Sequence, residues 1–294
     1  MHQRIFKYSL SLTFIFFLSF CSFGQSYWHF QNDNDLFFSK DYYYSNGLFF
    51  NYGSVSENDK NLSYHFELGQ EIYNPSFRYL TDTKSYDYPY SGFLYLKSKR
   101  IKTQLDRSSE LSLSIGISGD ASLAKQLQNW YHNTFLGLDN LAWVDAMPQK
   151  FLIDLSYSFA REWTLEKDLK LAMEAGAQLG LVKTYLQHRA FLLLNGLSVL
   201  SFNNPTNQNR QSGFLIGVQQ QYFFHDFMIQ GPLDHSNTFE RELVPYRITF
   251  MAGPVFYLNN WAVKAIWNYR SKDNRSQRHP WHPYMSIGIT KLML

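Results

Sequence analysis

The chain has 294 residues, of which 27 are Lys or Arg and 24 are Asp or Glu, so its formal net charge is only +3. Such a small positive surplus does not indicate a nucleic-acid partner. Aromatic residues make up 18% of the sequence. Beyond the first residues, no apolar stretch approaches the roughly 20 residues that a membrane-spanning helix requires.

Residues 1–24 are predicted to be a secretory signal peptide. Basic residues come first, followed by an apolar run too short to span a membrane and a small-residue pattern that ends at Gly24. Cys21 is the single cysteine of the chain, and the bulky Phe20 before it argues against a lipoprotein anchor. We therefore expect residues 25–294 to form one domain without disulfides or thiolate metal sites.

The main pattern after the signal peptide is alternation of apolar with polar or small residues. In residues 108–119, for example, Leu111, Leu113 and Ile115 alternate with serines and a glycine. Alternation at period two predicts strands with one apolar and one polar face. About twelve such segments follow one another, at 26–32, 45–53, 61–73, 90–101, 108–119, 151–164, 168–182, 186–200, 211–224, 242–258, 261–270 and 284–294.

An even number of long strands, an export signal and many aromatic residues predict an all-β fold, a transmembrane antiparallel β-barrel of the bacterial outer membrane. A water-soluble sandwich shows the same alternation, but usually with shorter strands and fewer Tyr and Trp near their ends. If the first strand rises from the periplasm, three longer connections face outward, at 33–44, 74–89 and 120–150. The connections between them are shorter and are predicted to be periplasmic turns, at 54–60, 102–107 and 165–167.

The third outward connection is the one place where the period changes. Leu123, Leu127 and Trp130 fall at helical spacing, which predicts a short helix in this loop. Gln128 and His132 are four residues apart and share one face of it. A loop that serves only as a connection rarely presents such side chains together, so this helix is a candidate functional element.

Five motifs, taken in this order, resemble the outer-membrane lipid A 3′-O-deacylase (LpxR-like) family. They are "QND" at 31–33, "DYYYSNG" at 41–47, "QEIYNP" at 70–75, "QNWYH" at 128–132 and "AW" at 142–143. The resemblance implies a twelve-stranded barrel whose substrate is lipid A, the lipid anchor of lipopolysaccharide. The expected reaction is hydrolysis of an ester-linked acyloxyacyl chain at the extracellular rim.

The resemblance also implies roles for single residues. His132 would be the general base that activates a water, and Asp139 an acidic residue acting near it. Asn32 belongs to the Asn–Asp pair of the family, and Ser45 supplies the hydroxyl of the "YSNG" element. The predicted substrate-binding residues are Arg78, Gln128 and Asn129, with Arg78 as a candidate contact to a phosphate of lipid A.

A divalent cation, Ca²⁺, is the expected cofactor. Oxygen ligands from Asp33 and Asp35 suit a hard cation, which would polarise the ester carbonyl. The repeated "NDND" leaves the register of the Asn–Asp pair open between 32–33 and 34–35. Lipopolysaccharide and outer-membrane lipids are the expected partners, and no obligate protein partner is evident.

Two alternatives stay open. In a phospholipase-type serine esterase, Ser45, His132 and Asp139 would form a nucleophile, base and orienting acid, although Ser45 lacks a Gly-x-Ser-x-Gly context. A non-enzymatic barrel, either a channel or a structural protein, would have an open polar lumen. Five residues are predicted to point into that lumen: Lys170, Glu174, Gln178, Lys264 and Arg270.

Overall fold

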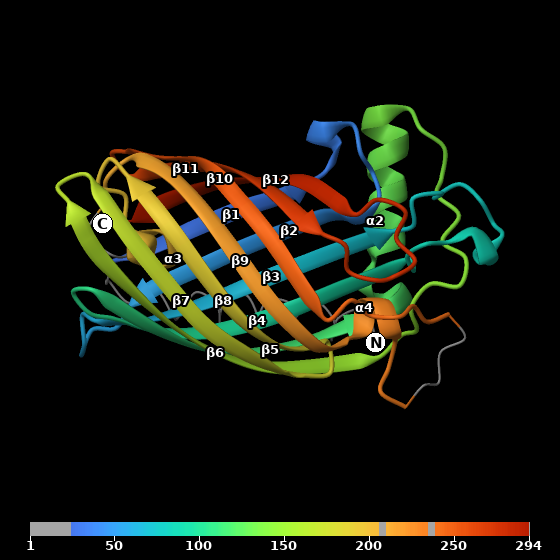
Figure 1. Cartoon of the computed structure of the whole chain (residues 1–294), viewed down its shortest axis with the longest axis horizontal. Helices are drawn as coiled ribbons and strands as arrows, with labels where there is room; N and C mark the ends of the chain where they lie inside the picture. The colour runs from blue at the N-terminus through green and yellow to red at the C-terminus, as the bar shows by residue number, and fades with distance from the viewer. Residues whose placement is uncertain (1–24, 206–209, 235–238, 294) are drawn as a thin grey trace, which may run out of the picture.

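Twelve antiparallel strands form one closed barrel in the computed structural model, which describes residues 25–205, 210–234 and 239–293 (Figure 1). The strands are β1 Ser26–Asn34, β2 Tyr43–Val55, β3 Leu62–Asn74, β4 Ser91–Thr103, β5 Arg107–Ser118, β6 Phe151–Glu166, β7 Leu169–Gly180, β8 Lys183–Leu194, β9 Gly213–Asp226, β10 Tyr246–Leu258, β11 Trp261–Ser271 and β12 Trp281–Met293. Each strand pairs with its sequence neighbours, and β1 pairs with β12 to close the ring. The predicted barrel is confirmed, whereas the predicted signal peptide lies outside the described residues.

The helical segments are short and all lie in connections. They are the 3₁₀ turns η1 Leu36–Phe38, η2 Thr83–Ser85 and η3 Gly119–Ser122, the π-helical turn η4 His132–Leu136, and the helices α2 Ala124–Tyr131, α3 Val199–Asn203 and α4 Phe227–Gln230. The helix expected between the fifth and sixth strands is thus α2. No helix among the described residues is long and apolar enough to cross a membrane.

The barrel wall is apolar outside and polar inside. On β5, Leu111 and Leu113 are 44% and 46% exposed, whereas Ser112 and Ser114 between them are only 4% and 6% exposed. This is the reverse of a water-soluble sheet, in which the apolar face is buried against a core. Strands that stand in lipid need an apolar outer face, so this pattern fits a membrane barrel.

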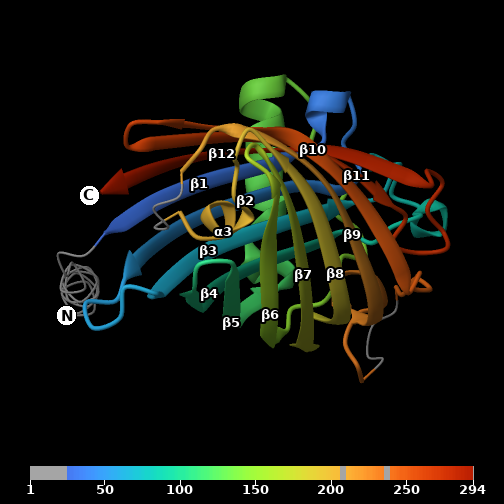
Figure 2. The same ribbon diagram turned by 60° about the vertical axis from the view of Figure 1, so that its left-hand side comes forward.

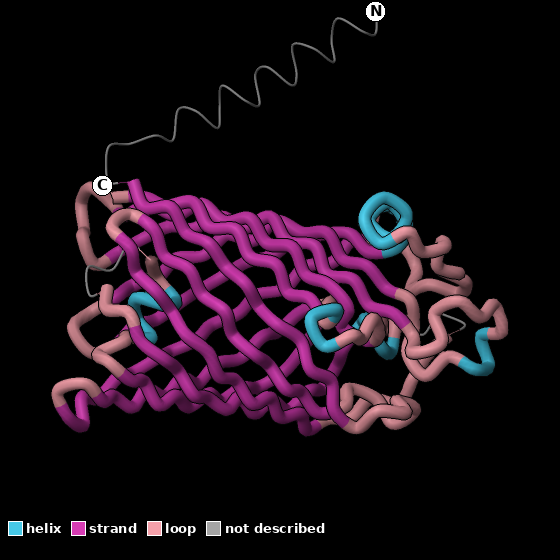
Figure 3. Tube along the Cα trace, turned by 90° about the horizontal axis from the view of Figure 1, so that it is seen from above, coloured by secondary structure: helices cyan, strands magenta, loops and turns pink. Residues whose placement is uncertain are grey.

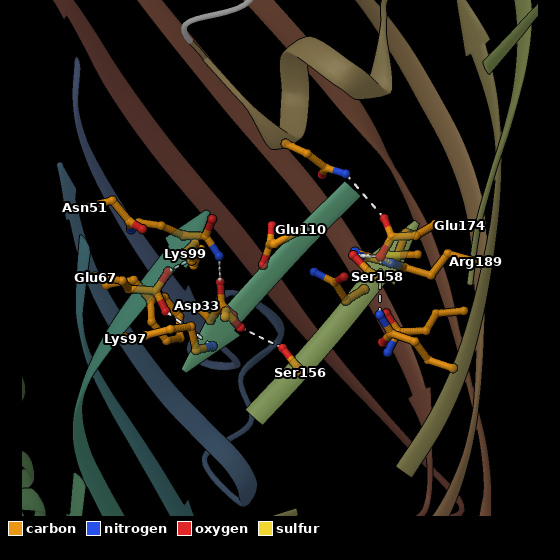
Figure 4. A pocket seen from close by; sticks show the side chains of 18 of the residues that line it. Asp33, Asn51, Glu67, Lys97, Lys99, Glu110, Ser156, Ser158, Glu174 and Arg189 are labelled. Carbon is orange, nitrogen blue, oxygen red and sulfur yellow. Dashed lines mark hydrogen bonds and ion pairs between the residues drawn. The ribbon is translucent and has the colours of Figure 1, made fainter. Parts of the chain in front are cut away.

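The lumen contains a polar cavity of about 520 Å³ lined by paired charges (Figure 4). Glu67 lies 2.7 Å from the Lys99 ammonium and 3.7 Å from that of Lys97. On the far side Glu174 pairs with Arg189. Four of the five residues predicted to point inward line this cavity: Glu174, Gln178, Lys264 and Arg270. The fifth, Lys170, pairs with Glu162 at 2.9 Å near the start of β7.

The eighth strand is shorter than predicted because the chain turns into the barrel. Asn195 and Gly196 have φ of 58° and 72°, which ends β8 at Leu194 instead of residue 200. The apolar residues that continue the predicted strand then pack inside the barrel, where Leu197 is fully buried. Figure 2 shows α3, which belongs to this connection, within the ring of strands.

Five of the longer connections gather at one end of the barrel, which we call the long-loop rim (Figure 3), whereas the β8–β9 connection, which holds α3, lies at the opposite end. The long-loop rim consists of residues 35–42, 75–90, 119–150, 227–245 and 272–280, apart from the undescribed residues 235–238. Helix α2 stands against the outer surface of the wall there and is seen end-on in Figure 3. Its close approach depends on Gly92 of β4, since an added Cβ would overlap the Cβ of Ala124 and lie 2.5 Å from Oγ of Ser122.

Candidate active site

His132 and Asp41 form a buried pair at the long-loop rim. Nε2 of His132 lies 3.2 Å from Oδ2 of Asp41, and the two side chains are only 2% and 3% exposed. The histidine follows α2 at the start of the π-helical turn η4, and the carboxylate comes from the β1–β2 connection. Single π-helical turns occur often at functional sites because they re-aim a side chain without ending the helix.

Three more side chains fix Asp41. Oδ1 of Asp41 accepts hydrogen bonds from the Ser45 hydroxyl at 2.9 Å and from the Asn74 amide at 3.1 Å. Nε of Arg78 lies 3.1 Å from Oδ2, and Nη1 of Arg78 donates to the Asp41 carbonyl at 3.2 Å. A carboxylate held at both oxygens in this way cannot rotate away from His132.

The backbone after Asp41 is strained in a way that serves this arrangement. Tyr43 adopts φ of 59°, which is unusual for a bulky residue, and its hydroxyl donates to Asp87 at 2.7 Å. The pairing of β2 with β3 is then irregular between Tyr44 and Asn46. Ser45 lies at this irregularity, four residues from the carboxylate that it contacts.

Gln128 and Asn129, predicted to bind substrate, hold the loop together. Oε1 of Gln128 accepts from the Trp143 indole at 3.0 Å, and Oδ1 of Asn129 accepts from the Leu141 backbone at 2.9 Å. The returning chain is thereby attached to α2. Their contacts are internal, and a role in binding substrate stays a prediction.

A closed circuit of contacts links α2 back to Asp41. Trp143 stacks on Tyr90 with ring centroids 4.9 Å apart, and the Tyr90 hydroxyl donates to the carbonyl of Arg78. Arg78 in turn binds Asp41. The position of His132 therefore depends on three connections at once.

Electrostatics keep Asp41 ionised. Burial alone would raise the pKa of its carboxyl, but the hydrogen bond from His132 and the nearby Arg78 guanidinium outweigh burial and hold the pKa below its usual value. A carboxylate only accepts hydrogen bonds, so a neutral His132 carries its proton on Nε2. Its other nitrogen, Nδ1, is buried and has no hydrogen-bond partner among the described residues.

The structure separates the two possible Asn–Asp pairs. Asp33 lies on the lumen side, where it accepts from Tyr44 at 2.9 Å and from Gln31 at 2.8 Å. Asp35 lies in the β1–β2 connection, and its Oδ2 accepts from the Tyr42 backbone at 2.9 Å. Asp33 and Asp35 thus occupy different environments.

The carboxylates of Asp33 and Asp35 differ in whether one of their oxygens lacks a hydrogen-bond partner. Oδ1 of Asp35 is buried without a hydrogen-bond partner among the described residues. Burial raises the pKa of this carboxyl well above its usual value. Asn32 and Asn34 make local contacts, to the Gly47 carbonyl at 3.2 Å and to the Leu36 backbone N–H at 2.7 Å respectively. In the described chain, no group of three or more His, Cys, Asp or Glu residues is arranged to hold a metal ion.

The structure does not place Asp139 in contact with His132. Asp139 is exposed, and no described residue forms a hydrogen bond or ion pair with its side chain. Asp41, which does contact the histidine, was not singled out from the sequence, although it opens the "DYYYSNG" motif. Its place four residues before Ser45 was the available signal.

An apolar groove of about 340 Å³ lies between α2 and the outer wall of the barrel. Gln70 and Leu94 come from the wall, and the helix side contributes Leu123, Leu127 and Trp130, together with Gln126. Trp130 is 55% exposed although it is two residues from His132. The groove therefore opens on the lipid-facing side, along the helix that precedes His132.

The fold and this site define a membrane-type β-barrel with a buried His–Asp pair at its long-loop rim. A family model described as "Outer membrane protein LpxR" matches residues 10–292, and the chain belongs to this family. The solved structure of LpxR from Salmonella typhimurium is similar, with a TM-score of 0.74 and 17% identity over 90% of this chain and 99% of that one.

More distant barrels are also similar in outline. The KdgM porin gives a TM-score of 0.45 at 8% identity over 91% of this chain and 99% of that chain. The β domain of the Bordetella autotransporter BrkA gives 0.47 at 9% identity, covering 91% and 98%. No curated protein matches the sequence.

Proposed function

We propose that this protein is an outer-membrane lipid A deacylase, a carboxylic ester hydrolase that removes an ester-linked 3′-O acyloxyacyl chain of lipopolysaccharide at the extracellular rim. The observation that carries the proposal is the buried His132–Asp41 pair at the long-loop rim, together with an apolar groove along the helix that precedes His132. Membership of the LpxR family and the motifs quoted above supply the substrate class.

His132 is the general base of this reaction. Asp41 holds the proton on Nε2, so the lone pair of Nδ1 accepts a proton from water as the water attacks the ester carbonyl. The ionised Asp41 then stabilises the imidazolium that forms, and the imidazolium gives this proton to the leaving sugar oxygen as the ester C–O bond breaks and the acid is released. Ser45, Asn74 and Arg78 act through Asp41 as positioning residues.

A divalent cation fits best at Asp35. Its unpartnered, buried carboxylate oxygen is the kind of ligand that Ca²⁺ takes, and amide or carbonyl oxygens nearby would complete the set. When bound, such a cation supplies polarisation of the ester carbonyl. Asp33 suits this role less well, because both of its carboxylate oxygens already accept hydrogen bonds.

The groove beside α2 supports a lipid substrate. Its walls are mainly apolar and it faces the bilayer side of the barrel, so an acyl chain reaches it without leaving the membrane. The exposed ring of Trp130 suits the interface between lipid and water. The ester would then lie near His132 while its chain stays in an apolar environment.

The contacts of Ser45 favour water over serine as the nucleophile. In a serine triad the histidine lies between the nucleophile and the acid. Here Asp41 lies between, because Ser45 donates to Oδ1 and His132 contacts Oδ2. A fluorophosphonate that labels Ser45 in the native protein would reverse this preference.

The lumen argues against a channel. The connection that holds α3 is fixed to two separate strands of the wall, since Ser198 donates to Glu162 of β6 at 2.9 Å while Asn204 donates to Ser63 of β3 at 3.1 Å. Its apolar residues fill the barrel between these anchors. A connection packed inside the lumen in this way narrows the path that a channel would require.

Incubation of the detergent-purified protein with hexa-acylated lipid A, in Ca²⁺ or in EDTA, tests the proposal. Loss of one acyloxyacyl mass in Ca²⁺ is the expected result. Glycerophospholipid in the same micelles serves as the comparison substrate. Hydrolysis of the phospholipid alone would assign the site to a phospholipase instead.

A further inference from the structure

Side chains from two connections meet at the ring of Tyr42, the residue after Asp41. Lys40 immediately precedes Asp41, and its ammonium lies 6.0 Å from the ring centroid of Tyr42. The imidazole of His279 stacks on the same Tyr42 ring at 4.8 Å, with an interplanar angle of 13°. Residues 40–42 therefore carry one cation and contact the imidazole of a second loop.

Arg278 is held by its backbone at Tyr43 and by its side chain over an aromatic ring of a third connection. The backbone N–H groups of Arg278 and His279 both donate to the Tyr43 hydroxyl, at 3.1 and 3.2 Å. The guanidinium of Arg278 lies 4.0 Å from the centroid of Phe77, next to Arg78 in sequence. The β11–β12 connection thus spans from the β1–β2 loop to the β3–β4 loop.

These side chains differ from two neighbouring arginines. Arg270, near the end of β11, pairs with Asp273 at 2.9 Å, and Arg275, in the same connection as Arg278, pairs with Glu242 at 3.0 Å. In contrast, the side chains of Lys40 and Arg278 have neither an acidic partner nor a hydrogen bond within the described parts of the chain. Aromatic stacking fixes a cation without neutralising it, so their donors stay available to an anion.

We propose that Lys40, Arg278 and His279 form an anion site that binds a phosphate group of the substrate at the rim. This inference rests on the proposed function. Phosphate monoesters suit the site, because an arginine fork and a lysine ammonium are the usual protein partners of phosphate oxygens. The N–H of the His279 ring adds a donor, and Arg78, 23% exposed, borders the site from the side of Asp41.

The location gives this contact a role in orientation. Lipid A bears its phosphates on the same disaccharide as its esters, so a phosphate held at residues 278–279 fixes the sugar relative to His132. The acyl chain enters the groove beside α2 from the lipid side. Headgroup and chain would thus be held at two places, with the scissile ester between them.

Arg278→Gln tests the site, with Arg275→Gln as the matched control from the same connection. On bisphosphorylated lipid A, the Arg278 variant should raise KM about tenfold and leave kcat within about twofold, the loss expected for one charge-assisted hydrogen bond. The control should retain the wild-type KM. On lipid A freed of its phosphates by mild chemical hydrolysis, the Arg278 variant and the wild type should have the same KM.

A penalty of equal size on dephosphorylated lipid A would overturn the proposal, and so would an equal effect of Arg275→Gln. Relief of the difference by millimolar inorganic phosphate alone would assign the site to free phosphate and also overturn it. A separate binding measurement tests the anion site independently of catalysis. In the His132→Ala background, Arg278→Gln should weaken binding to vesicles containing bisphosphorylated lipid A, even if no lipid A is hydrolysed by the wild type.

Discussion

Asp41 receives Ser45 on one carboxylate oxygen and His132 on the other, at 2.9 and 3.2 Å. The Asp41 carboxylate therefore connects a strand of the barrel wall with the helical loop outside it. The position of His132 therefore depends in part on the β1–β2 connection, which supplies Asp41. This relationship makes Asp41 the positioning residue of the proposed reaction and yields the first prediction.

Asp41→Asn should lower kcat by about 10²–10⁴-fold with little change in KM, because an amide does not hold the histidine in one tautomer as a carboxylate does. Ser45→Ala removes one of several contacts to Asp41 and should cost about tenfold or less. Acyl release is the measurement. Complete loss in Ser45→Ala with a mild effect of Asp41→Asn would point to a serine nucleophile.

Asp139 provides the companion test. Because it does not contact His132, any contribution from it must come through bound substrate, and Asp139→Asn should leave the imidazole NMR resonances of His132 unchanged. Asp41→Asn should shift them. A shift of the same size in the Asp139 variant would show that the loop places Asp139 beside the histidine in solution.

Calcium should stabilise the protein through Asp35. A ligand that binds only the folded state raises the free energy of unfolding by about 2.7 kcal/mol at a concentration one hundred times its Kd. The rise in melting temperature with Ca²⁺ should disappear in Asp35→Asn and persist in Asp33→Asn. Loss of the rise in the Asp33 variant alone would place the cation in the lumen.

Gly92→Ala should displace α2 without opening the barrel. The added Cβ overlaps that of Ala124, so the helix must move away from the wall and carry His132 with it. A displacement of about 1 Å costs on the order of 10²-fold in rate. Gly92→Ala/Ala124→Gly restores the space and should recover most activity, which a general folding defect would not allow.

The connection that packs inside the lumen predicts that the protein does not conduct ions. Wild-type protein in planar bilayers should show no current steps. Leu197→Asp/Leu200→Asp places charges in the apolar cluster that surrounds α3, where these leucines are 0% and 2% exposed, and should expel this connection and produce steps. Leu105→Asp is the control, because Leu105 is fully exposed in the β4–β5 turn at the same end of the barrel as the α3 connection. Steps in the wild type would favour a channel.

The wall of the barrel could be predicted from sequence because its signal is local. Period-two alternation identifies each strand without knowledge of its neighbours, and all twelve predicted segments overlap observed strands. The end of β8 was missed because the apolar residues after it, such as Leu197, look the same whether they face lipid or fill the lumen. Only the positive φ of Asn195 and Gly196 distinguishes the two.

The site could be predicted in part. The helical spacing around Gln128 identified α2, and the family motif identified His132. The partner of His132 was sought nearby in the chain, at Asp139, whereas the contact is made by Asp41 from a distant connection. Formation of the barrel brings these connections together, and no local pattern in a single sequence predicts which loop residues will then be in contact.

The most direct test of the account compares wild-type protein with His132→Ala on hexa-acylated lipid A in Ca²⁺, followed by mass spectrometry of the lipid. The account predicts that the wild type removes one acyloxyacyl chain and that the variant, with its barrel intact by heat-modifiable gel mobility, removes none. Equal acyl release by both proteins would contradict the central claim that His132 activates the attacking water.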